Sequence, residues 1–191
     1  MVNVAIFVSG GGTNCENIIR YFHDSDSVNI ALVLSSKPNA YALVRATNLG
    51  VPTMVMPKAD FADEDKLIAA MDRYNIDFIV LAGFLLMIPS FLTRRYNHRM
   101  VNIHPALLPK YGGKGMYGHH IHEAVRTNNE TETGISIHYV SNVCDGGEII
   151  FQAKTPVSPT DTSDDIAANI HELEQAYFPE IIERVIKETI S

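Results

Sequence analysis

An apolar run that ends in three consecutive glycines is the feature that most constrains how this chain can fold. Residues Val2–Val8 are apolar almost throughout, and the segment Ser9–Asn14, with Gly-Gly-Gly at its centre, follows directly. Because the run lacks period-two alternation, it indicates a strand that is buried on both faces of a parallel sheet. Apolar residues at helical spacing after the glycines predict a helix there, with Thr13 as its N-cap.

Segments typical of strands and helices alternate along the rest of the chain. We expect further strands at Asn29–Leu34, Val51–Met56, Asp77–Ala82 and Met100–Ile103, and helices at Ala40–Asn48 and Asp60–Tyr74. After the glycine-rich loop Gly112–Gly118 we expect a helix around His122–Asn128, strands at Gly134–Val140 and Glu148–Ala153, and a helix over Asp161–Lys187. The last two strands alternate more than the others, which favours antiparallel pairing. The pattern predicts an α/β fold in one domain, residues 1–191: a single doubly wound, mostly parallel sheet with an antiparallel C-terminal edge and a long C-terminal helix.

Composition argues against several classes of partner and location. Of the 191 residues 46% are hydrophobic, enough for one sizeable core, and the formal net charge of −7 gives no basic surface for nucleic acid or membranes. The two cysteines, Cys15 and Cys144, are too few for a disulfide framework, and no run approaches the roughly 20 apolar residues that span a bilayer. No basic region precedes the apolar N-terminus, as it would in a signal peptide. We therefore expect a cytoplasmic protein that binds neither nucleic acid nor membranes.

The glycine segment predicts a phosphate site. Glycines between a strand and a helix let the backbone approach a ligand, and the free N–H groups of a helix N-terminus favour an anion. A tight turn alone would need only one or two glycines. The segment matches neither the dinucleotide pattern GxGxxG, because Cys15 stands at its sixth position, nor a P-loop. We expect a mononucleotide-type phosphate at Gly11, Gly12, Thr13 and Asn14.

Two further motifs carry groups suited to acid–base chemistry. Asn102 and His104 precede Pro105 at the end of a predicted strand, and residues two apart in a strand project to the same side. An amide donor beside an imidazole suits a reaction that develops charge on an oxygen, whereas a histidine bonded to nearby backbone is the structural alternative. Asp145-Gly146-Gly147 is either a plain hairpin turn or the carrier of a catalytic carboxylate, and the residues alone leave both open.

Histidines are dense in one part of the chain. His119, His120 and His122 lie close together, with His138 and His171 elsewhere. Such density suggests zinc, but ligands on one helix face usually stand at i and i+4, and we expect no acidic or cysteine partner at that offset. We expect no metal, and local hydrogen bonds in a mobile, glycine-rich loop instead.

Together and in this order, these motifs resemble the phosphoribosylglycinamide formyltransferase family. The matching stretches span nearly the whole chain: Ser9–Asn14, Leu81–Phe84, Asn102–Tyr111, Gly134–Val140, Asp145–Gly147 and Glu174–Pro179. The Asn-x-His-Pro-x-Leu-Leu-Pro stretch is highly specific to folate-dependent formyl transfer. The resemblance implies a Rossmann-like formyltransferase fold and transfer of the formyl group of 10-formyltetrahydrofolate to the amine of glycinamide ribonucleotide, a step of purine biosynthesis. The folate would be a cosubstrate, and no metal would be required.

The resemblance also implies roles for the matching residues. Asn102, His104 and Asp145, the catalytic trio, would act together: Asn102 donates to the oxygen of a tetrahedral intermediate, and Asp145 holds His104 as an imidazolium that supplies a proton. The ribonucleotide would be held by its phosphate at Gly11, Gly12, Thr13 and Asn14 and by its ribose at His171 and Glu174. The folate would lie against Leu85, Leu86, Met87, Ile88, Asn102, Ser141, Asn142, Val143, Cys144 and Asp145.

Departures from the family and three alternative functions frame this interpretation. Leu85-Leu86-Met87 stands where many members carry an arginine, a second folate-side arginine is replaced near Glu64, and the Gly112–Gly118 loop is longer than the family's connection and could act as a lid. Methionyl-tRNA formyltransferase has an extra C-terminal domain and formyltetrahydrofolate hydrolase an extra N-terminal one, and we expect neither here. A non-catalytic nucleotide-binding module would explain the glycines but not the catalytic trio.

Overall fold

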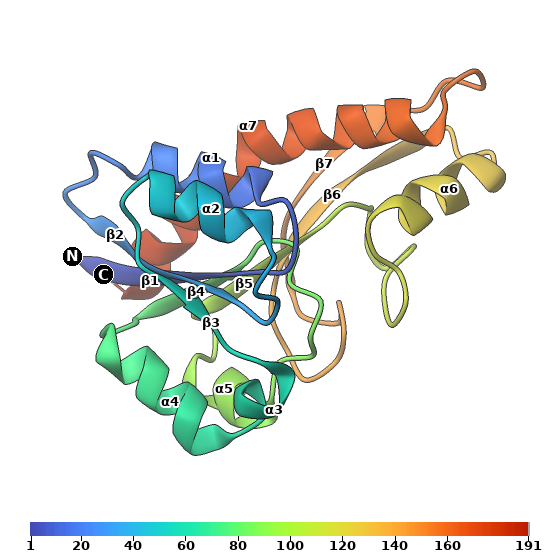
Figure 1. Ribbon diagram of the computed structural model, residues 1–191. Helices are drawn as coiled ribbons and strands as arrows, with labels where there is room; N and C mark the ends of the chain where they lie inside the picture. Colours follow the sequence, from blue (N-terminus) through green and yellow to red (C-terminus); the bar gives the residue numbers. More distant parts are fainter. Residues whose placement is uncertain (191) are drawn as a thin grey trace.

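Seven strands form one continuous sheet in the computed structural model, which describes residues 1–190 (Figure 1). In chain order they are β1 (Val2–Val8), β2 (Val28–Ser35), β3 (Thr53–Val55), β4 (Phe78–Leu81), β5 (Met100–His104), β6 (Glu132–Tyr139) and β7 (Ile149–Pro156). Across the sheet the order is β3-β2-β1-β4-β5-β6-β7, and neighbours as far as β5 pair in parallel. The two remaining pairs, β5 with β6 and β6 with β7, are antiparallel. The predicted mostly parallel sheet with an antiparallel C-terminal edge is confirmed.

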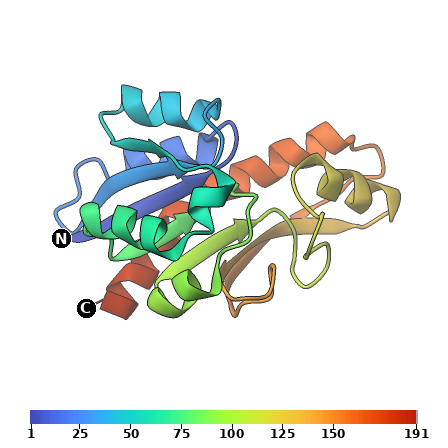
Figure 2. The same ribbon diagram turned by 60° about the horizontal axis from the view of Figure 1, so that its bottom comes forward.

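Helices cover both faces of the sheet and divide the core in two (Figures 1 and 2). The first core lies under α1 (Thr13–Tyr21), α2 (Tyr41–Asn48), α6 (His119–Thr127) and α7 (Ser163–Ile190). The second lies under α3 (Lys58–Phe61), α4 (Glu64–Arg73) and α5 (Ser90–Arg95). Strand β1 serves both: Val4, Ile6 and Val8 point into the first core, and Ala5 and Phe7 into the second. Among residues 1–190 no helix is long and apolar enough to cross a membrane.

The helices differ in three places from the sequence-based expectation. Thr13 does not cap α1, because Gly12 occupies the N-cap position with a left-handed backbone and no side chain caps it. The single helix expected over Asp60–Tyr74 is two, since Asp63 interrupts it and caps a new helix by accepting from the Lys66 N–H. The short α5 is absent from the expectation because six residues are too few to show helical periodicity.

The long helix α7 contains a proline and is tied to α1 at that point. Pro179 has no N–H, so the carbonyl of Gln175, four residues earlier, loses its partner within the helix. The side-chain amide of Asn17 on α1 donates to this carbonyl at 3.0 Å. The proline thereby frees a backbone group that holds α7 beside the first turns of α1.

Strand direction places the predicted site residues at one end of the molecule. The glycine segment follows β1, Leu85–Ile88 follows β4, and Asn102 and His104 end β5. Because these three strands run parallel to one another, their carboxyl ends meet at the same edge of the sheet. This is the edge at which open α/β sheets bind their ligands.

Candidate active site

Three polar side chains gather where β5 meets β6. In the antiparallel pairing Asn102 lies opposite His138 and His104 opposite Ser136, so Asn102, His104 and His138 share one face of the sheet. Asn102 Nδ2 is 3.1 Å from His138 Nε2. His104 and His138 are 4% and 2% exposed, so water does not compete for these contacts. The expectation that Asn102 and His104 project to the same side is confirmed.

Asp145 completes this cluster from the loop between β6 and β7. Its Oδ2 lies 3.5 Å from His104 Nδ1, and its Oδ1 lies 3.7 Å from His138 Nε2. Its φ of 52° is a left-handed conformation that aspartate tolerates better than most residues. The motif Asp145-Gly-Gly is therefore both a turn and the carrier of a carboxylate that faces two histidines.

Burial and charge set the ionisation of the two central groups. Burial opposes ionisation of Asp145, but the His138 and His104 rings, when protonated in acid, and the Gly113 N–H together hold the pKa of this carboxyl below its usual value. Burial lowers the pKa of His104, although Asp145 and the Tyr111 carbonyl act in the opposite direction. Asp145 is therefore an anion near neutral pH, and His104 is mainly neutral. Contrary to the expected imidazolium, desolvation outweighs the ion pair in the free protein.

The glycine-rich loop lies directly over this cluster. The Tyr111 carbonyl is 2.7 Å from His104 Nε2, and the Gly113 N–H donates to Asp145 Oδ2 at 3.0 Å. A carbonyl only accepts, so His104 carries its proton on Nε2. The 3.5 Å between His104 Nδ1 and Asp145 is long for an N–H···O⁻ bond, as expected for a ring nitrogen without a proton. His104 thus presents a donor to the loop and a free base to the carboxylate.

The glycine segment enters α1 with its carbonyls held by α2. Gly12 has a φ of 79°, and a Cβ there would lie 2.4 Å from that of Ala42, so only glycine fits. The Ala42 N–H donates to the Gly10 carbonyl at 3.1 Å, and Arg45 Nε donates to the Gly11 carbonyl at 2.8 Å. The N–H groups of the first turn of α1 have no acceptor within the helix. The segment therefore presents backbone donors that favour an anion, beside the Arg45 guanidinium, which is itself paired with Glu16.

Asn14, His171 and Glu174 lie together between α1 and α7. Asn14 Nδ2 donates to Glu174 Oε2 at 3.0 Å, and Gln175 Nε2 donates to Asn14 Oδ1 at 2.9 Å. His171 Nδ1 is 3.6 Å from Glu174 Oε2. Burial raises the pKa of the Glu174 carboxyl, against the lowering influence of Asn14 and His171. Helix α7 thus occupies the side-chain amide of Asn14 and leaves its backbone N–H for a ligand.

Two segments expected to hold the folate border the same edge. In Leu85–Ile88 the first and third residues are half exposed, the second packs against the second core, and the fourth is buried in it. The Leu85 N–H donates to Ser9 Oγ at 3.0 Å, which ties this segment to the end of β1. Thr93 on α5 donates through Oγ1 to Asn142 Oδ1 at 2.6 Å, which ties α5 to the loop that holds Ser141, Val143, Cys144 and Asp145. Exposed apolar side chains between ordered loops suit a flat, apolar ring.

The histidines around α6 make separate contacts. His119 Nε2 lies 3.5 Å from Glu123 Oε1. An acidic residue therefore does stand at i+4, and the expectation that none does was wrong. His120 packs edge-on against Tyr117, and His122 is buried, with no partner for its Nδ1 among the described residues. Within residues 1–190 no group of three or more His, Cys, Asp or Glu side chains is arranged to hold a metal ion.

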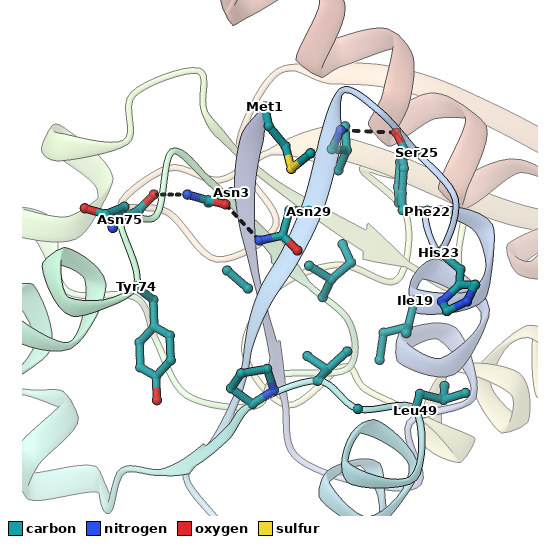
Figure 3. Close-up of a pocket in the computed structure, with 16 residues that line it drawn as sticks. Met1, Asn3, Ile19, Phe22, His23, Ser25, Asn29, Leu49, Tyr74 and Asn75 are labelled. Carbon is teal, nitrogen blue, oxygen red and sulfur yellow. Dashed lines mark hydrogen bonds between the residues drawn. The ribbon is translucent and has the colours of Figure 1, made fainter.

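A hollow of about 650 Å³ lies at the opposite end of the sheet, near the amino ends of β1 and β2 (Figure 3). Amides cross it: Asn29 Nδ2 donates to Asn3 Oδ1 at 2.9 Å, and Asn3 Nδ2 donates to the Asn75 carbonyl at 3.1 Å. These amides already bond one another, and the hollow contains none of the predicted site residues. We therefore place the candidate active site at the carboxyl ends of the strands, where the perturbed carboxylate and imidazole lie.

Three residues of this site lie outside the sequence-based expectations. His138 appears there only among scattered histidines, and strand register is the signal that would have found it, because it stands opposite Asn102. Arg45 and Gln175 reach the site from the flanking helices α2 and α7. No local motif marks them, since only the packing of the helices brings them to the glycine segment.

The chain is similar to known proteins over nearly its whole length. The sequence model of the formyl transferase family matches residues 2–182. The chain is 36% identical over 190 residues to phosphoribosylglycinamide formyltransferase of Escherichia coli, which covers 95% of this chain and 85% of that protein. It is 35% identical over 194 residues to the chloroplastic phosphoribosylglycinamide formyltransferase of Arabidopsis thaliana. That match covers 98% of this chain and 66% of the Arabidopsis protein. The crystal structure of phosphoribosylglycinamide formyltransferase from Anaplasma phagocytophilum superposes with a TM-score of 0.88 at 29% identity, covering 98% of this chain and 88% of that one.

Proposed function

The chain belongs to the formyl transferase family, and from this premise we propose that it is a phosphoribosylglycinamide formyltransferase. It transfers the formyl group of 10-formyltetrahydrofolate to the amine of glycinamide ribonucleotide, giving formylglycinamide ribonucleotide and tetrahydrofolate in purine biosynthesis. The observation that carries the proposal is the cluster of Asn102, His104 and Asp145 at the carboxyl end of β5. It stands at the same sheet edge as the glycine segment, so a phosphate anchor and an acid–base group face one site.

The ribonucleotide binds between α1 and α7. Its phosphate lies at the backbone N–H groups of Gly11, Gly12, Thr13 and Asn14, where the helix N-terminus and the nearby Arg45 guanidinium favour an anion. Glu174, with His171 beside it, accepts from the ribose hydroxyls. Burial raises the pKa of Glu174 because it removes water from the carboxylate. Hydrogen bonds from the ribose hydroxyls would take the place of that water.

The folate lies against the Leu85–Ile88 segment and the loop Ser141–Asp145. Leu85, Met87 and Val143 are 50%, 55% and 66% exposed and offer apolar contact to its ring system. Backbone groups of the two loops supply the polar contacts. Glu64 stands where we expected a folate-side arginine to be replaced, so the acidic tail of the folate meets a different set of charges in this chain.

The reaction needs oxyanion stabilisation and the movement of one proton. The substrate amine attacks the formyl carbon, and the former carbonyl oxygen of the tetrahedral intermediate takes up negative charge. One N–H of Asn102 donates to this oxygen, an interaction that strengthens as the charge develops. When the carbon–nitrogen bond to the folate breaks, the attacking amine has lost one proton and the leaving nitrogen has gained one. The chemistry consumes no net proton.

His104 can carry that proton because its two ring nitrogens have different roles. Nδ1 is free of a proton and faces ionised Asp145, so a proton that arrives there forms an imidazolium that the carboxylate stabilises. Nε2 carries the proton to be given away, and the Tyr111 carbonyl now accepts from it. Delivery to the folate therefore requires that substrate replace Tyr111 at Nε2.

Purified protein tests the proposal when it is incubated with 10-formyltetrahydrofolate and either glycinamide ribonucleotide or methionyl-tRNA. We expect formylation of the ribonucleotide only. Formylation of the tRNA, or hydrolysis of the folate without transfer, would assign the chain to one of the related activities. Binding of the ribonucleotide without any turnover would favour a nucleotide-binding module.

Organisation and location follow from the same premise. We take residues 1–191 as one formyltransferase domain, because every strand of the described residues joins one sheet. The substrates are small molecules, and the acidic net charge of −7 argues against a nucleic-acid partner. The cytoplasmic location expected from the cysteine content stays a prediction.

A further inference from the structure

The buried histidine His138 lies at the centre of the cluster, but the proposed chemistry gives it no role. We propose that His138 is a positioning residue that fixes the orientation of the Asn102 side-chain amide, so that an N–H rather than the oxygen of Asn102 faces the reacting group. The inference rests on the proposed function only for the identity of that group. The orientation itself follows from contacts within the protein.

The hydrogen bond at Nδ1 fixes which nitrogen of His138 carries the proton. Nδ1 lies 2.8 Å from the Tyr139 carbonyl oxygen, which can only accept. The ring is therefore protonated on Nδ1, and in the neutral ring Nε2 holds a lone pair. Gly147 makes room for this bond, because a Cβ there would come 1.7 Å from the Tyr139 oxygen and 3.5 Å from His138 Nδ1.

The lone pair on Nε2 decides how the Asn102 amide lies. Asn102 faces His138 across the β5–β6 ladder, and its Nδ2 lies 3.1 Å from Nε2. An NH2 group can donate to the lone pair, whereas the amide oxygen in that place would bring two acceptors together. With one N–H of Asn102 bound to His138, the second N–H stays free for the substrate oxygen. His138 is 2% exposed, so no bulk water can take its place.

Asp145 does not take over this task. Its Oδ1 is 3.7 Å from Nε2, beyond hydrogen-bonding distance, whereas Asn102 Nδ2 is within it. Asp145 acts on His104, and His138 acts on Asn102. The two histidines therefore serve the two halves of the reaction, proton transfer and oxyanion binding, from opposite strands of one ladder.

Kinetics of His138→Leu test the proposal, with Asn102→Ala and the double variant to complete a cycle. We expect His138→Leu to lower kcat by about 10- to 100-fold, somewhat less than removal of an oxyanion donor, with KM for both substrates changed less than about threefold. In the Asn102→Ala background the same change should cost less than about twofold, because the residue it orients is gone. His138→Gln can offer an acceptor oxygen near the place of Nε2 and should recover part of the rate.

His122→Leu is the matched control, because His122 is also buried but has no hydrogen bond at Nδ1 to any residue that the structure describes. It should leave kcat within about twofold of the wild type. Losses that multiply in the double variant, or a normal kcat in His138→Leu, would overturn the proposal.

Histidine NMR of the unsubstituted protein supplies a test that needs neither activity nor a folded variant. Isotope-labelled histidine spectra should show His138 as the neutral Nδ1–H form. An Nε2–H form would overturn the proposal whatever the enzyme's substrate, whereas an Nδ1–H form in a protein with no formyltransferase activity would count against the proposed function alone.

Discussion

Asp145→Asn removes one negative charge from the candidate site with little change in shape. The φ of Asp145 is 52°, and asparagine adopts this left-handed conformation as readily as aspartate does. The amide oxygen of asparagine can still accept from the Gly113 N–H, which now donates to Asp145 at 3.0 Å. Folding should therefore survive, and the measured change should report on charge.

The size of the effect can be worked out from the contact with His104. Asp145 Oδ2 and His104 Nδ1 are 3.5 Å apart, and their side chains are 11% and 5% exposed. Coulomb's law at this distance gives about 5 kcal/mol with an effective dielectric of about 20 and about 1 kcal/mol in bulk water. A nearly buried pair lies closer to the stronger limit, so about 3 kcal/mol is a lower figure for the lost attraction. At about 1.4 kcal/mol for each tenfold, kcat should fall by about 100-fold or more.

Two measurements check this prediction. Steady-state kinetics should show the loss in kcat, with KM for each substrate changed less than about threefold, because the charge is needed most in the transition state. An NMR titration should show that the pKa of His104, already lowered by burial, falls further without the carboxylate. Asp165→Asn, which removes an exposed carboxylate that accepts from Thr162 at the start of α7, should leave both unchanged. Near-normal turnover of Asp145→Asn across about pH 6 to 9 would refute the reasoning and leave Asp145 as a turn residue.

Four further tests concern the ribose side of the site, the glycine segment, metal dependence and a buried histidine outside the site. Glu174→Ala should raise KM for the ribonucleotide far more than KM for the folate. A rise confined to the folate KM would contradict the placement of Glu174 at the ribose. Arg45→Met should raise the ribonucleotide KM by about tenfold, because Arg45 holds the Gly11 carbonyl at 2.8 Å and also pairs with Glu16; an unchanged KM would make Arg45 a surface residue. Chelators should leave kcat intact, and activity lost to a chelator and restored by zinc would reveal a metal. Burial lowers the pKa of His122, so below about pH 6.5 the unfolded chain binds more protons than the folded one, and the free energy of unfolding decreases as the pH is lowered. In His122→Leu this pH dependence, measured by urea unfolding between about pH 7 and 5, should be weaker by up to about 1.4 kcal/mol per pH unit.

The sheet could be predicted from the sequence because strands that are buried on both faces appear there as nearly continuous apolar runs. Val2–Val8 is bounded as expected, and the carboxyl-end position of Asn102 and His104 follows from parallel strands alone. The helix ends were less predictable. Thr13 has the residue type of an N-cap, but close packing of α2 on the glycine segment places Gly12 there instead. Tertiary contact, which no local pattern encodes, decided that position.

The electrostatic state of the candidate site was beyond the sequence for a related reason. A carboxylate near a histidine predicts an imidazolium, and the pairing of Asp145 with His104 is present. Burial of the His104 ring by β5 and β6 lowers its pKa, where the carboxylate alone would raise it. How deeply a ring is buried depends on the whole fold. Register likewise placed His138 opposite Asn102, a contact between residues 36 apart in the chain.

A histidine that is neutral at rest suits formyl transfer better than a permanent cation would. An interaction present equally in substrate complex and transition state lowers KM but does not speed the chemical step. In the proposed mechanism, neutral His104 gains its positive charge only when it takes the proton of the attacking amine, which is when charge develops on the oxygen that Asn102 would bind. Ionised Asp145, at 3.5 Å, then stabilises a cation that did not exist before. Burial of His104 therefore confines much of the attraction within the cluster to the transition state, and a variant that exposed the ring to water would lose rate even if every hydrogen bond were kept.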